Sequence, residues 1–224
     1  VLDSLDFTGT FYVYGTAASF DKRLNEWKSI ADDGHELGNH TLFHPCNSKN
    51  EGNNWVKPEY DLNNYSITRI KDEIKLTNTL LRSTDGKKKR TFAYPCGDKI
   101  VGDTFYVNIL KENPDLIAAR GTTPGMNHIN DVDLFNVKAY GVGNGSGEEL
   151  IRLVKKAEKE QALLVIIFHG VGGEHNLNIS IPEHKKFLNY LKKNEKDIWI
   201  APMVEIAEYI KQYNTHNEGK NMNQ

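Results

Sequence analysis

The chain has 224 residues, of which 26% are charged, and its formal net charge is −2. Its basic residues are scattered except for a short run at 87–90, so charge does not favour a nucleic-acid partner. No apolar run approaches the roughly 20 residues that span a bilayer, and the first residues lack the pattern of a signal peptide. We predict one domain over residues 1–213 and a polar tail over 214–224.

Strand-like and helical patterns alternate along the chain. Runs rich in β-branched and aromatic residues predict strands at 10–14, 35–40, 90–95, 116–120, 135–140, 163–170 and 197–202. Apolar residues at helical spacing predict helices over 24–34 and 65–81, and pairs with capping-box spacing precede two more, Ser146/Glu149 and Ser180/Glu183. The run "LLVIIFHG" at 163–170 is apolar almost throughout, as in a parallel strand covered on both faces. The chain is therefore predicted to be an α/β protein with a parallel sheet or barrel.

Polar residues follow several of the predicted strands. His40, Arg120 and His169 each stand at a carboxyl end, and so does Pro95. Because functional sites of parallel α/β folds form at the carboxyl ends of their strands, we expect these residues to share one site.

His40 and His44 have the spacing of two metal-ligating histidines on one helical turn. A thermolysin-like zinc peptidase also requires a glutamate after the first histidine, and Thr41 stands there instead. Spacing alone therefore leaves two possibilities open, a metal site and a pair of hydrogen-bonded structural histidines.

Four segments in a fixed order carry a family resemblance. "GHELGNHTLFHP" at 34–45 is followed by "FAYPCGD" at 92–98, "LLVIIFHG" at 163–170 and "IWIAPMVEIAEYIK" at 198–211. This set resembles the polysaccharide deacetylases, family four of the carbohydrate esterases, from about Leu2 to about Lys211. The resemblance implies a distorted (β/α)7-type barrel of parallel strands, which lacks its first strand in this chain.

The resemblance also implies a metal site. His40 and His44 would bind a divalent cation, usually zinc and sometimes cobalt or nickel. The hydroxyl of Thr41 and the rigid ring of Pro45 would hold the loop so that both imidazoles face inward. The family's Thr-Phe-Asp-Asp motif, which supplies the third metal ligand and the catalytic base, is not found in the chain and is expected upstream of Val1.

Further roles follow from the same resemblance. The backbone amide of Cys96 would donate to the oxyanion, and His169 would be the general acid that protonates the leaving group. Ala93 stands where many relatives carry an arginine that orients the catalytic aspartate, and we name Arg120 as a hypothetical replacement, although a surface ion pair is an equal alternative.

Substrate contacts are assigned to Tyr94 and Pro95 beside the oxyanion position, and to Trp55 in the long loop 47–66. Aromatic side chains can stack on sugar rings, although they more often hold a loop in place. We expect His175 to lie outside the site.

Cys46 and Cys96 each follow a strand that should line the same site. We predict a disulfide between them, with two small buried thiols as the alternative.

The expected function is metal-dependent removal of acetyl groups from a polysaccharide or glycan, most plausibly from the nitrogen of an amino sugar. The alternatives are an O-acetyl esterase acting on a hemicellulose such as xylan and a non-catalytic carbohydrate-binding homologue. The family resemblance implies an extracytoplasmic location. The sequence does not specify the glycan or the oligomeric state.

Overall fold

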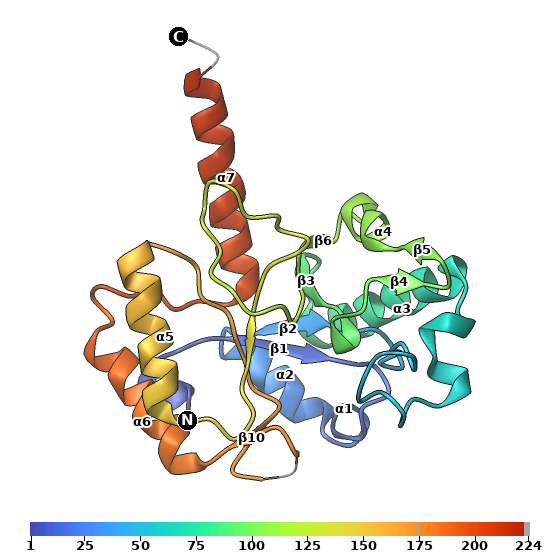
Figure 1. Cartoon of the computed structure of the whole chain (residues 1–224), viewed down its shortest axis with the longest axis horizontal. Coiled ribbons are helices and arrows are strands. Elements are labelled where there is room, and N and C mark those ends of the chain that lie inside the picture. The colour runs from blue at the N-terminus through green and yellow to red at the C-terminus, as the bar shows by residue number, and fades with distance from the viewer. Residues whose placement is uncertain (174, 222–224) are drawn as a thin grey trace.

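The centre of the fold is a parallel sheet of four strands in the order β1-β2-β3-β6 (Figure 1). In this computed structural model, residues 1–173 and 175–221 are described. The strands are β1 (Thr10–Val13), β2 (Glu36–Asn39), β3 (Arg90–Ala93) and β6 (Leu116–Arg120). All residues of β2, β3 and β6 are buried, as expected for parallel strands with both faces covered. The α/β class with a parallel sheet is confirmed.

Helices lie on both sides of this sheet and beside it (Figure 1). They are α1 (Ala18–Lys22), α2 (Leu24–Asp32), α3 (Ile67–Asp85), α4 (Val107–Glu112), α5 (Gly147–Glu160), α6 (Ile181–Lys193) and α7 (Met203–Asn221). Helix α3 packs on β2, α5 packs on α6, and α7 contacts β6 at its beginning and then projects away from the body. None of these described helices is long and apolar enough to cross a membrane.

Local sequence signals account for the helix ends. The hydroxyl of Ser146 accepts a hydrogen bond from the Glu149 N–H, and the Glu149 carboxylate accepts one from the Ser146 N–H, which is the predicted capping box. Ser180 caps α6 in the same way, but the carboxylate of Glu183 accepts from the Gly147 N–H instead. Glu183 therefore ties the start of α6 to the start of α5.

The remaining short strands form three separate two-stranded sheets. They form the pairs β4 (Ile100–Val101) with β5 (Thr104–Phe105), β7 (Tyr140–Gly141) with β8 (Ile166–Ile167), and β9 (Gly170–Val171) with β10 (Asn178–Ile179). Of the predicted strand 135–140, Tyr140 lies in β7, and Val137 forms only an isolated bridge with Arg120. The prediction of a strand at 197–202 is wrong, because this segment has no hydrogen-bonded strand neighbour among the described residues.

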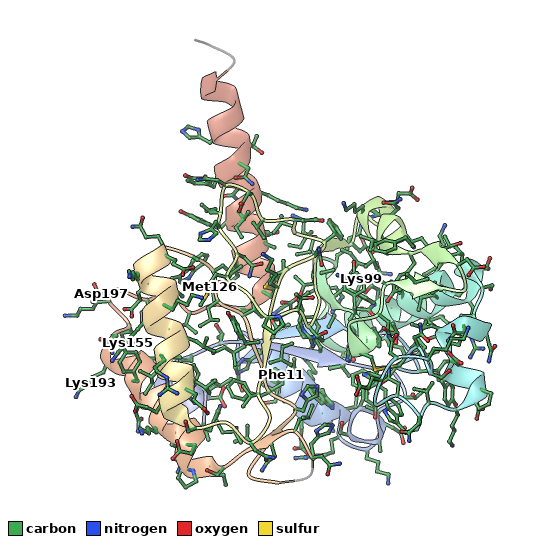
Figure 2. The ribbon with its side chains drawn as sticks, in the orientation of Figure 1. Phe11, Lys99, Met126, Lys155, Lys193 and Asp197 are labelled. Carbon is green, nitrogen blue, oxygen red and sulfur yellow. A yellow bond between two sulfur atoms is a disulfide. The ribbon has the colours of Figure 1, made fainter. Side chains whose placement is uncertain are left out.

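A cavity of about 1480 Å³ separates β1 from the segment that contains β8. Among the described residues β1 pairs only with β2, so the sheet is open at this edge and the closed barrel stays a prediction. Phe11 of β1 lines the cavity and lies near the centre of the molecule in Figure 2, whereas Lys155 and Lys193 lie at the outer edge of the molecule.

The C-terminal boundary of the domain is not marked by the end of a helix. Residues 214–221 of the predicted tail continue α7, and residues 222–224 lie outside the described residues. The division at residue 213 stays a prediction.

Candidate metal and catalytic site

Several predicted site residues meet at one end of this cavity. His40, Arg120 and His169 line it, although His40 directly follows β2, Arg120 ends β6 and His169 follows β8. His44 and Trp55 line the same space. The carboxyl ends of parallel strands therefore converge as expected from the sequence.

The loop that carries His40 and His44 is not helical, contrary to the geometry that their spacing suggested. Thr41 has a φ of 65° and His44 a φ of 55°, which are left-handed conformations. The Thr41 N–H donates to the side chain of Asn39 at 2.8 Å, and the His44 N–H donates to the Thr41 hydroxyl at 3.0 Å. These bonds offset the backbone strain and bring the two imidazole centroids to 4.6 Å.

Asn39 is a supporting residue that the sequence did not reveal. It is fully buried, and its amide group donates to the Ile74 carbonyl at 2.9 Å and to the Asn78 side chain at 2.7 Å. Asn39 therefore fixes the loop that carries His40 and His44 against α3.

The imidazole of His40 has the tautomer of a metal ligand. Its Nδ1–H donates to the Ala93 carbonyl at 2.8 Å, which leaves the lone pair of Nε2 free. Burial, followed by the neighbouring His44, holds the pKa of His40 well below its ordinary value. Burial also lowers the pKa of His44. Both rings are therefore neutral near pH 7, the state in which imidazole binds a cation.

A third ligand does not join these two in the described part of the chain. Among the side chains that the structure describes, no Asp, Glu or further His forms with His40 and His44 a group of three ligand atoms that all lie within 4.8 Å of one another. The donor set within this range is thus two imidazoles.

The predicted disulfide between Cys46 and Cys96 is confirmed. It joins the loop after β2 to the turn after β3, and the Cα atoms of the two cysteines are 5.7 Å apart. Cys46 is fully buried, and its Sγ lies 3.7 Å from Nδ1 of His44. The bridge therefore braces the loop that carries the histidine pair.

Cys96 has a φ of 53°, and its backbone N–H finds no acceptor among the described residues. That free donor suits the expected oxyanion role. Like Cys96, Tyr94 and Pro95 do not line the cavity, and both are buried. The hydroxyl of Tyr94 donates to the Phe135 carbonyl at 2.9 Å. The side chains of Tyr94 and Pro95 are buried in the protein, so the structure does not support their predicted contact with substrate.

Arg120 is a buried cation without a carboxylate partner in the described residues. Its side chain is only 7% exposed, lines the cavity and lies over the Tyr12 ring at 4.7 Å. The Gly121 carbonyl, at 3.5 Å, is its one hydrogen-bond acceptor within the described chain. Arg120 therefore does not form the surface ion pair that was the alternative to a role in the site, because it is buried and lines the cavity.

His169 and His175 both line the cavity, although the sequence predicts that His175 lies outside the site. His175 stacks on His169 with ring centroids 4.9 Å apart. Burial lowers the pKa of His169, and the nearby His175 and Arg120 lower it further. Sequence reasoning missed His175 because a tertiary contact, and not a local pattern, places its ring on that of His169. Gly172 and Gly173, which have positive φ angles, were the signal of a turn near it.

Aromatic residues form the wall of the cavity near the histidines. Trp55 is 58% exposed, and its ring centroid lies 6.4 Å from that of His44. Tyr14 lies 5.7 Å from the same imidazole, and Tyr12 lies 6.4 Å from that of His40. An exposed tryptophan beside a polar site can stack on a sugar ring.

Residues 1–113 match a family model described as polysaccharide deacetylase. Protein YlxY of Bacillus subtilis, described as uncharacterized, is 30% identical over 97 residues, which are 43% of this chain and 25% of that protein. The chain thus spans a quarter of the length of this curated relative.

Two solved structures share the fold. A putative polysaccharide deacetylase from Mycobacterium smegmatis is 15% identical, with a TM-score of 0.62 over 95% of this chain and 74% of that one. A mutant of the peptidoglycan deacetylase PdaC from Bacillus subtilis is 14% identical, with a TM-score of 0.53 over 99% of this chain and 86% of that one.

Proposed function

The chain belongs to the polysaccharide deacetylase family, and we propose that it is a metal-dependent hydrolase that removes acetyl groups from a glycan, specifically the N-acetyl group of an amino sugar. One observation carries this proposal. The neutral pair His40 and His44 lies in the same cavity as a further histidine, His169, that can donate a proton.

The histidine pair fits a divalent metal, for which zinc is our first choice and cobalt or nickel the alternatives. His40 has a free Nε2, and its Nδ1–H is held by the Ala93 carbonyl, as is usual for a ligating imidazole. When bound, the metal would polarise the acetyl carbonyl and make water more acidic. Two protein ligands leave room for substrate, water and a carboxylate.

The other roles belong to groups of the chain itself. We assign the free N–H of Cys96 to the oxyanion that forms when the acetyl carbonyl is attacked. We assign His169 to protonation of the departing amine, a role that suits an imidazole because its ordinary pKa is close to neutral pH.

Arg120 is assigned to an anion in the cavity. Arg120 is 7% exposed, and its guanidinium, with one carbonyl acceptor among the described residues, retains donors for a carboxylate. We propose that it orients the carboxylate of the catalytic base by a charge-assisted hydrogen bond. Trp55 is assigned to stacking against a sugar ring, which its exposure and its place beside His44 support.

A non-catalytic carbohydrate-binding protein is the second candidate. The observation in its favour is that the described residues contain no third ligand close to the histidine pair. An O-acetyl esterase would use the same groups, so the substrate must decide between the two activities. The disulfide supports an extracytoplasmic location, which we also propose.

The test is acetate release by the complete, zinc-loaded protein from N-acetylglucosamine oligomers and, in parallel, from acetylated xylan. We expect release from the amino-sugar substrate and none from the His40→Ala variant. Release from xylan alone would favour the esterase. Binding of either glycan without acetate release would favour the non-catalytic candidate.

A further inference from the structure

We propose that reduction of the Cys46–Cys96 disulfide creates a second metal site, in which the two cysteine thiolates and Nδ1 of His44 bind a thiophilic divalent cation such as Zn²⁺ or Cd²⁺. The proposal is independent of the deacetylase activity, because it concerns the reduced protein and a different set of ligand atoms.

The three ligand atoms are already close together. Sγ of Cys46, Sγ of Cys96 and the ligand nitrogen of His44 all lie within 4.8 Å of one another. In a tetrahedral zinc site, bond lengths of about 2.3 Å to sulfur and 2.0 Å to nitrogen place these two ligands about 3.5 Å apart. The observed distance from Cys46 Sγ to His44 Nδ1 is 3.7 Å. Once the disulfide opens, the sulfurs have to separate only to about 3.8 Å to complete the same tetrahedron.

The backbone around Cys46 does not depend on the disulfide. The Cys46 N–H donates to the Tyr60 carbonyl at 3.2 Å, and the Leu62 N–H donates to the Cys46 carbonyl at 3.0 Å. Cys46 is thus held on both sides of its Cα atom. Its thiol should keep its place when the bridge is reduced.

The two cysteine loops are also joined without sulfur. The carboxylate of Asp98, two residues after Cys96, accepts hydrogen bonds from the Asn47 N–H at 2.7 Å and from the Asn50 side chain at 2.5 Å. The Asp98 N–H closes its own turn by donating to the Pro95 carbonyl at 2.9 Å. Reduction should therefore leave two thiols facing each other beside an imidazole, which is a preorganised site rather than two free ends.

The chemistry balances with a phosphine as reductant. The S–S bond breaks and each sulfur takes up a proton, while the phosphine is oxidised to a phosphine oxide with oxygen from water. The cation then displaces both thiol protons and forms two bonds to sulfur and one to nitrogen. Soft thiolate ligands favour Zn²⁺ or Cd²⁺ over hard cations such as Mg²⁺.

His44 links this site to the proposed catalytic metal. A neutral imidazole has one lone pair, so His44 serves one cation at a time. A cation on the cysteines would draw His44 away from its pair with His40. The redox state of the bridge would thus decide which of the two neighbouring metal sites includes His44 as a ligand.

The test is a Co²⁺ titration of the protein in air-free buffer, with and without a phosphine reductant that is removed before cobalt is added. Thiolate-bound Co²⁺ gives an intense near-ultraviolet charge-transfer absorption, whereas histidine-bound Co²⁺ does not. We expect this absorption to grow to one equivalent in the reduced protein and to be absent from the oxidised protein. The variant with both Cys46→Ser and Cys96→Ser should not show it.

Two further variants separate the sites. His40→Ala should keep the absorption, because His40 is not a ligand of the second site. His44→Ala should weaken cobalt binding to the reduced protein at least tenfold. The proposal is overturned if the reduced protein shows no thiolate absorption, if His44→Ala binds as tightly, or if far-ultraviolet circular dichroism shows that reduction unfolds the chain. Failure of the deacetylase proposal would instead appear as missing acetate release from the oxidised protein.

Discussion

The imidazole of His175 stacks on that of His169, with centroids 4.9 Å apart and ring planes 17° from parallel. Gly170 leaves room for this contact. A Cβ on Gly170 would lie 3.2 Å from that of His175 and 2.7 Å from the Gly173 carbonyl, so only glycine fits there without displacement. The Leu177 N–H donates to His175 Nδ1 at 3.0 Å and fixes the orientation of the ring.

His175→Phe should raise the pKa of His169. The phenyl ring keeps the stack and removes a neighbouring group that lowers the pKa, so burial and Arg120 remain as the causes of the shift. Imidazole ¹H–¹⁵N spectra of the metal-free protein, recorded against pH, measure this directly. His128→Phe, a change at an exposed histidine, is the control. An unchanged His169 titration in His175→Phe would refute electrostatic coupling between the two rings.

His40→Ala and His44→Ala should each weaken Zn²⁺ binding to the oxidised protein by roughly a hundredfold or more. Each removes one of two neutral imidazoles in a small donor set, and metal affinity depends steeply on the number of ligands. Calorimetric titration measures the affinity.

His128→Ala again provides the matched control for adventitious binding at the surface. If His40→Ala and the control bound zinc equally well, the histidine pair would be structural, as the alternative interpretation of the sequence allowed.

The sequence predicted which residues meet at the site, but it did not predict the conformation of the loop that carries His40 and His44. The four-residue spacing of His40 and His44 suggested a helical turn, whereas Thr41 and His44 have positive φ angles. Such angles cost energy in a residue with a Cβ and are adopted only where surrounding bonds compensate. Here the compensation comes from Asn39, which lies in β2 and is anchored to α3. No local propensity reveals a tertiary bond of that kind.

Strand prediction failed where a neighbouring strand was missing. Residues 10–13, 36–39, 90–93 and 116–120 pair with one another and form the sheet. The segment 197–202 has an equally strand-like composition, but it lies beside the cavity, and the Trp199 side chain there is 57% exposed. A strand needs a hydrogen-bonded partner, which composition does not supply.

Arg120→Lys should reduce the rate of deacetylation by about tenfold to a hundredfold. A lysine keeps the positive charge but loses the planar fork that holds a carboxylate by two hydrogen bonds. Arg69→Lys is a matched control, because Arg69 also lies over a tyrosine ring, that of Tyr65 at 3.8 Å, but outside the cavity. Full activity of Arg120→Lys would argue against a bidentate role. Acetate affinity, measured by calorimetry, gives a second readout that does not require turnover.

Replacing both Cys46 and Cys96 with serine should lower the free energy of unfolding by about 2–4 kcal/mol. The two residues are 50 positions apart, and chain-entropy estimates for closing a loop of this length are about 4 kcal/mol. A typical domain has about 5–15 kcal/mol of stability, so the variant should remain folded. Urea denaturation followed by fluorescence measures the difference. A loss below about 0.5 kcal/mol would show that the hydrogen bonds of the two loops do most of the bracing.

Asp61 should make the free energy of unfolding depend on pH in the acid range, because its carboxylate holds the loop around Cys46. Its carboxylate accepts hydrogen bonds from the Ser48 hydroxyl at 2.6 Å, from the Ser48 N–H at 3.2 Å and from the Asn63 N–H at 3.0 Å. Burial opposes ionisation, but these donors outweigh it and lower the pKa of Asp61 from 3.8 to about 2. Because the folded pKa lies below the unfolded one, the stabilisation is complete above about pH 4 and is lost as the pH falls through about 2.

Asp61→Asn should therefore cost about 1 kcal/mol at pH 6, after allowance for solvent screening, and progressively less as the pH falls towards 2. Urea denaturation at a series of pH values gives both curves. Asp103→Asn, which changes an exposed carboxyl in the turn between β4 and β5, is the control. Its free energy of unfolding should equal that of the unmodified protein at every pH. If the free energy of unfolding differed by the same amount between Asp61→Asn and the unmodified protein from pH 6 to pH 2, the shape of the side chain, and not its charge, would hold Ser48 and Asn63 in place. In that case the loop around Cys46 would owe none of its stability to the ionised carboxylate.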